Sequence, residues 1–104
     1  MNATVREWLI NEVLGMVDEE MLQSLYGDYL STLDEGISDM RNQLASGDFA
    51  MLDKTAHTLK GATSTVGDNE MFDAVIRLRD AAKASDSAAA SLAATEIESL
   101  RVSR

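Results

Sequence analysis

The chain has 104 residues and a net charge of −9, from 18 acidic and nine basic side chains. This length supports one hydrophobic core but not two, so we expect a single domain over residues 1–104. A surface this acidic repels phosphate backbones and anionic lipids, which argues against nucleic acid and membrane partners. The absence of cysteine excludes disulfides and thiolate chemistry.

The composition favours an all-α fold, because proline is absent, aromatic residues are few and helix-forming residues dominate. The N-terminus lacks the apolar segment of a signal peptide, and no apolar run approaches the ~20 residues of a membrane span. These features, with the lack of cysteine, predict a cytoplasmic protein. Met1 and a capped first helix favour a free-standing one.

The first predicted helix is short. Thr4 and Glu7 form a T-x-x-E capping box, and the helix is expected to run to about Met16. Its apolar residues at helical spacing are Trp8, Leu9, Val13 and Met16. The indole of Trp8 is expected to plug one end of the fold.

Four longer helices are predicted to follow, each bounded by local signals. Asp18 caps a helix of about seven turns that ends at Gly47, Asp48 caps the next, Gly67 ends it and Asp68 caps the fourth. "KASDS" then precedes a last helix. The expected buried residues, helix by helix, are Leu22, Leu25, Tyr26, Tyr29, Leu33, Ile37, Met40 and Leu44; Phe49, Leu52, Ala56, Leu59, Thr63 and Val66; Met71, Phe72, Val75, Leu78 and Ala82; and Leu92, Ala93, Ile97 and Leu100. Met16, Met21, Met40 and Met71 are expected to fill the core.

The connections are short, so neighbouring helices should be antiparallel. The predicted fold is an antiparallel four-helix bundle with a short N-terminal capping helix. Since one core is expected to use every apolar stripe, we predict a monomer.

The only histidine, His57, is predicted to lie on the solvent side of the third helix. With Leu52 set as the buried direction, His57 falls at ~140°, Lys60 at ~80°, Gly61 at ~180° and Ser64 at ~120°. Lys60 and Gly61 are therefore the neighbours of the imidazole on the next turn.

A glycine inside a helix costs roughly 1 kcal/mol relative to alanine. At position 61 it also leaves the imidazole unshielded, so that a protein surface can approach the ring. An exposed imidazole is a nucleophile at neutral pH, and Lys60 can offset the charge of a phosphoryl group attached to it. Five of the nine basic residues lie between 54 and 83, which provides a less acidic patch for an acidic partner.

The stretch "AHTLKGATSTVG" resembles the signature of histidine-containing phosphotransfer (HPt) domains, H-x-[LI]-K-G with a second glycine ten residues after the histidine. His57, Leu59, Lys60, Gly61 and Gly67 fit this pattern. Leu78 also stands where the family commonly has leucine, and the helix order resembles the family's bundle. Ser64 replaces a frequent glycine and Arg79 a frequent acidic residue; neither is expected to affect the phosphorylation chemistry.

This resemblance implies a phosphorelay intermediate of two-component signal transduction. His57 would be the phosphoacceptor, taking a phosphoryl group from a receiver-domain aspartate and passing it to another response regulator. Lys60 would stabilise the phosphoryl charge and Gly61 would give the receiver clearance. The resemblance implies no autonomous kinase activity, no cofactor of its own, and Mg²⁺ in the partner receiver domain. The expected partners are receiver domains and hybrid histidine kinases.

Several other functions compete with this one. A helical adaptor that binds signalling proteins without being phosphorylated is the main alternative. The dimerisation region of a histidine kinase usually has an acidic residue after the histidine and a nearby proline, and this chain has neither. The phosphotransfer segment of a chemotaxis kinase would continue into further domains. No nucleophile motif supports a hydrolase, and one histidine without cysteine makes a structural metal site improbable.

Overall fold

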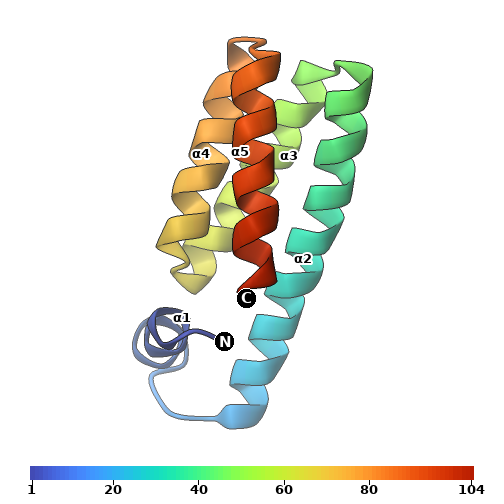
Figure 1. The fold of residues 1–104 in the computed structure, drawn as a ribbon. Helices are drawn as coiled ribbons and strands as arrows, with labels where there is room; N and C mark the ends of the chain where they lie inside the picture. The colour runs from blue at the N-terminus through green and yellow to red at the C-terminus, as the bar shows by residue number, and fades with distance from the viewer.

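The computed structural model describes all 104 residues, and every regular element in it is helical. The elements are α1 (Ala3–Trp8), η1 (Leu9–Leu14), α2 (Glu19–Ser46), α3 (Phe49–Val66), α4 (Asn69–Lys83) and α5 (Ser87–Val102). Helices α2 to α5 form an elongated bundle (Figure 1), and the whole chain measures 44 × 20 × 18 Å. Helix α3 packs against α2 and α4, and α5 packs against α4 and α2, so the predicted four-helix bundle with a short N-terminal helix is confirmed.

The helix boundaries follow the predicted local signals. Asp18, Asp48, Asp68 and Asp86 each accept a hydrogen bond from the backbone N–H three residues on. Gly47 and Gly67 close α2 and α3 in the left-handed conformation, with φ of 69° and 68°. That conformation is open to glycine at little cost, so each helix stops where its sequence predicts.

The first helix differs from the prediction. Asn2, not Thr4, caps it, because the Asn2 side chain accepts from Val5 N at 2.8 Å. After Trp8 the chain continues as the π-helical segment η1, whose last bond joins Gly15 N to Ile10 O. Within this N-terminal part of the chain, Val5 and Leu9 are buried, whereas Trp8, Val13 and Met16 are exposed.

Helix α1 and η1 lie across one end of the bundle (Figure 1), as expected for a capping helix. The Trp8 indole donates to Thr65 O at 3.1 Å and covers Gly67, where an added Cβ would collide with the ring. Trp8 therefore holds α1 against the end of α3, although two-fifths of its side chain stays exposed.

The core contains most of the predicted residues, including Leu22, Leu33, Leu52, Leu59 and Ile97. Three predictions are wrong: Leu92 is 75% exposed, and Met16 and Met21 also face solvent. Leu92 lies on the side of α5 away from Ala90, Ala93, Ala94 and Ile97, the residues that this helix buries.

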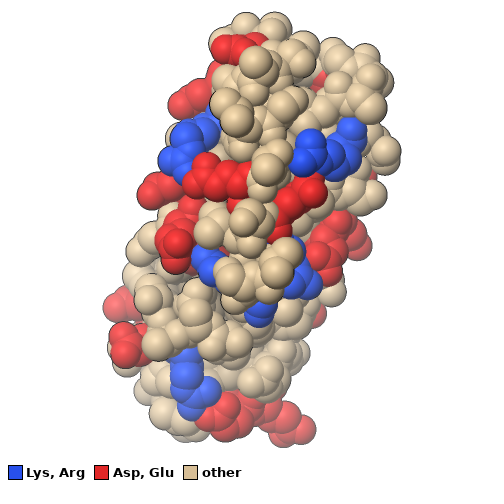
Figure 2. Space-filling view, in the orientation of Figure 1, with Lys and Arg blue, Asp and Glu red and all other residues tan.

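Polar contacts tie the bundle together outside the core. On the face where α5 is nearest the viewer, basic and acidic side chains alternate (Figure 2). Ion pairs there join α5 to its neighbours: Arg77 to Glu96, Arg41 to Glu98 and Arg101 to Asp34.

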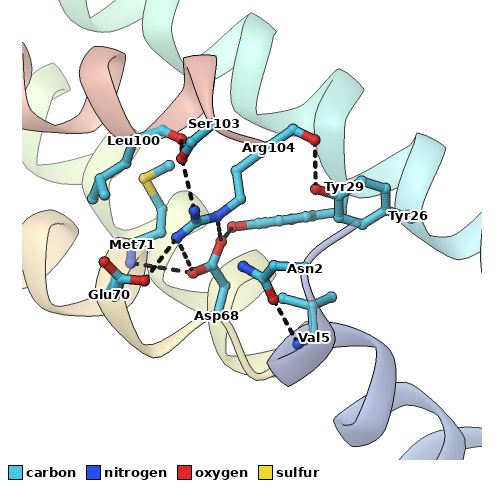
Figure 3. A network of polar contacts seen from close by, with 10 residues as sticks. All are labelled: Asn2, Val5, Tyr26, Tyr29, Asp68, Glu70, Met71, Leu100, Ser103 and Arg104. Atoms are coloured by element: carbon cyan, nitrogen blue, oxygen red, sulfur yellow. Dashed lines mark hydrogen bonds and ion pairs between the residues drawn. The ribbon is translucent and has the colours of Figure 1, made fainter.

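A buried network closes the end of the bundle beside α1 (Figure 3). Asp68, 2% exposed, accepts two hydrogen bonds from Arg104, at 2.8 and 2.9 Å, and one from the Tyr29 hydroxyl at 2.6 Å. Tyr26 donates to Arg104 O. The network connects α2, the α3–α4 turn and the segment after α5.

Candidate functional site

The candidate site lies on the outer face of α3. The buried side of this helix consists of Leu52, Ala56, Leu59, Thr63 and Val66, all on one stripe as predicted. These side chains anchor α3 in the bundle over its whole length. The opposite face, which carries His57 and Gly61, is left to solvent.

His57 is exposed, as the helical wheel predicts, and its imidazole takes part in no hydrogen bond or ion pair within the protein. The hydroxyl of the adjacent residue, Thr58, is engaged elsewhere, since it donates to the backbone oxygen of Lys54. Both ring nitrogens are therefore free for chemistry with an incoming group.

Gly61 leaves the next turn bare. A Cβ built on Gly61 would meet no other atom within 4 Å, and the residue is exposed. Packing does not require a glycine here, because there is room for a side chain. The glycine leaves this part of the helix surface, one turn from His57, without a side chain.

Lys60 lies at the edge of the buried stripe and is half-buried. No carboxylate lies within ion-pair distance of its ammonium group, so its charge is not neutralised by a neighbour. An anion bound at His57 would find this cation three residues further along the same helix.

The basic patch is smaller than the sequence suggests. Arg77 pairs with Glu96 and Arg79 pairs with Asp53, so two of its five cations are engaged. Lys54, Lys60 and Lys83 have no ion-pair partner. The Asp53–Arg79 contact was missed because it joins two helices, although the wheel already places Asp53 at ~100°, on the same edge as His57.

An apolar groove begins one residue beyond Gly61, between η1, α2 and α3. Its lining includes Leu9, Val13, Leu25, Tyr29, Ala62 and Val66. Around the same end of the molecule, Trp8, Met16, Val17 and Met21 are exposed. The expectation that no apolar face is left over is therefore wrong, because α1 and η1 bury only part of their apolar surface.

The structure contains no group of three or more His, Cys, Asp or Glu side chains arranged to hold a metal ion. None of its helices is both long enough and apolar enough to cross a bilayer.

Residues 24–102 match the family model of the Hpt domain. The match spans more than half of the chain, which therefore belongs to the Hpt family. No curated protein and no solved structure gives a significant match. Membership assigns the protein a general role in histidine phosphotransfer within two-component phosphorelays, where Hpt domains interact with receiver domains and histidine kinases.

Proposed function

We propose that His57 accepts a phosphoryl group from the aspartate of one receiver domain and passes it to the aspartate of another. The observation that carries this proposal is the free, exposed imidazole followed one turn later by the bare backbone of Gly61. No other histidine is present to serve as acceptor.

The transfer requires two things from this protein: a nucleophile, and a positive charge that stabilises the phosphoryl group. The lone pair of one imidazole nitrogen attacks phosphorus, and the N–P bond forms as the O–P bond to the receiver's aspartate breaks. The carboxylate leaves with the electron pair. The reverse sequence delivers the phosphoryl group to the next receiver.

Lys60 and Gly61 have complementary roles in this proposal. The unpaired ammonium of Lys60 offsets the phosphoryl charge on His57. The missing side chain at Gly61 lets the receiver's active site close over the ring. The Mg²⁺ needed for transfer would be held by the acidic pocket of the receiver, and this chain would contribute neither a cofactor nor kinase activity.

The apolar groove beside Gly61 supports the docking of a folded partner. On α3 its lining begins at Ala62, one residue beyond Gly61. Apolar contact supplies affinity, while the unpaired lysines of the patch suit an acidic partner.

The test is a transfer assay against a panel of phosphorylated receiver domains. We expect the protein to acquire acid-labile, alkali-stable phosphate from its cognate receiver, and His57→Gln to acquire none. Label retained by His57→Gln would refute the site. Receiver binding without any labelling would instead favour the alternative, a non-phosphorylated helical adaptor.

A further inference from the structure

The turn of α3 that precedes His57 carries a contact from the neighbouring helix. Asp53 lies four residues before His57, so their Cβ atoms are ~6 Å apart on the same face. Arg79 of α4 donates its Nε–H to Asp53 Oδ1 at 3.1 Å. The Asp53 side chain is 35% exposed and the Arg79 side chain 23%, so the pair lies at the edge of the surface rather than in the core.

This contact uses only part of the arginine. A guanidinium has five N–H donors, and Nε–H is the only one that Arg79 donates within the protein. Its Nη groups have no partner. Asp53 thus fixes Arg79 beside the face of α3 that carries His57. The Nη groups of Arg79, which can bind an anion through two parallel hydrogen bonds, stay available.

The contact also neutralises the negative charge of Asp53 near His57. An unpaired carboxylate one turn from His57 would repel a phosphoryl group attached to the ring. Arg79 cancels that charge, and it has donors left over for phosphoryl oxygens. The other arginine nearby on α4, Arg77, is engaged on the opposite side, with Glu96 of α5.

We propose that Arg79, held in place by Asp53, is a second cation of the phosphorylation site and contacts the phosphoryl group on His57 directly. Asp53 is its positioning residue. This inference rests on the proposed function, and it replaces the expectation that an arginine at position 79 leaves the phosphorylation chemistry untouched. The result is a longer-lived phosphohistidine than Lys60 alone would provide.

The proposal is tested on purified protein phosphorylated with phosphoramidate, which transfers its phosphoryl group to imidazole and releases ammonia. After removal of the donor, the loss of phosphohistidine is followed by phosphorus NMR. We expect Arg79→Gln to shorten the lifetime about two- to fivefold, the range for a partly exposed charge contact. The phosphohistidine lifetime in Arg79→Lys should lie between those of the parent and of Arg79→Gln. In 1 M salt the difference in lifetime between the parent and Arg79→Gln should become smaller, because the Debye length falls to about 3 Å.

Arg77→Gln is the matched control, since it removes an arginine from the same helix and breaks an ion pair of the same kind. We expect its lifetime to equal that of the parent. Equal lifetimes for Arg79→Gln and Arg77→Gln would overturn the proposal, provided that both variants melt at similar temperatures.

A double variant separates direct contact from mere cancellation of charge. Asp53→Asn keeps an acceptor oxygen for Arg79 but removes the negative charge. If Arg79→Gln still shortens the lifetime in the Asp53→Asn background, the direct contact is supported. If its effect vanishes there, the arginine acts only by neutralising Asp53, and the proposal is wrong. A parent protein that takes up no phosphate from phosphoramidate or from any receiver would instead refute the proposed function itself.

Discussion

At the scale of single residues, His57 and Gly61 show how a helix can expose a reactive ring without a cavity. The imidazole has no partner in the protein, and the glycine one turn away has open space above it. Gly61 lowers the stability of the helix, and no close packing contact requires a glycine at this position. The explanation that we propose for the glycine is a partner surface that approaches His57 from outside.

This explanation predicts that stability and activity move in opposite directions at position 61. Gly61→Ala should raise the free energy of unfolding by up to ~1 kcal/mol, because it restricts the unfolded chain and meets no steric obstacle. Phosphoryl transfer from a cognate receiver should slow, and slow further in Gly61→Gln. Urea midpoints and transfer rates measure the two effects.

Gly27 provides the control for this series. It is also exposed, lies within α2, and has open space where a Cβ would be. Gly27→Ala should stabilise the protein without slowing transfer. A Gly61→Gln protein that transfers as fast as the parent would rule out the clearance argument.

At the scale of helices, a different glycine determines how α2 and α3 fit together. A Cβ on Gly36 of α2 would lie 2.5 Å from Leu59 Cδ2 and 2.9 Å from its Cγ. Leu59 is fully buried, so it has little room to yield. The gap at Gly36 lets the leucine of the signature insert between the helices, and it keeps α3 close to α2.

Gly36→Ala is therefore expected to destabilise the protein by about 1–3 kcal/mol, the usual cost of overpacking a core. Gly27→Ala, in the same helix, should have the opposite sign. Urea denaturation of both variants measures the difference. Stabilisation by Gly36→Ala would mean that Leu59 can be displaced at no cost, against the packing described here.

At the scale of the whole molecule, the Asp68–Arg104 pair joins the segment after α5 to the turn between α3 and α4. Burial raises the pKa of Asp68, but the hydrogen bonds from Arg104 and Tyr29 and the charge of Arg104 outweigh it, so that the pKa lies below its usual value. The Arg104 side chain is 4% exposed. A buried carboxylate that loses such a partner is left uncompensated.

We expect Arg104→Met to lower the free energy of unfolding by about 3 kcal/mol. Arg101→Met is the matched control, because Arg101 makes a similar two-bond contact with Asp34, whose side chain is 59% exposed. It should cost less than about 1 kcal/mol. Equal losses in the two variants would contradict a special role for the buried pair.

The same pair predicts the response to acid. Because the folded-state pKa of Asp68 is depressed, its contribution is complete above the unfolded value of about 4 and is lost as pH falls through the folded value. Stability should therefore drop on acidification below about pH 4, and this drop should be smaller in Arg104→Met. Urea titrations between neutral pH and about pH 2 test it.

Much of this fold could be read from the sequence because it depends on local relations. Four helices start at an aspartate whose side chain reaches the N–H three residues on, and two end at a glycine that adopts positive φ. The exposure of His57 and Gly61 followed from helical periodicity alone. These features involve residues at most a few positions apart, so no knowledge of the neighbouring helices was needed.

The tertiary structure decided what depends on distant contacts. Only the docking of α1 and η1 determines that Leu9 is buried while Met16 is exposed. The fit of Leu59 against Gly36 and the pairing of Arg79 with Asp53 each join residues more than 20 positions apart. Periodicity gives the face on which a residue lies, but it does not give the side chain that meets it. The second cation beside His57 could therefore be inferred only once α3 and α4 were placed side by side.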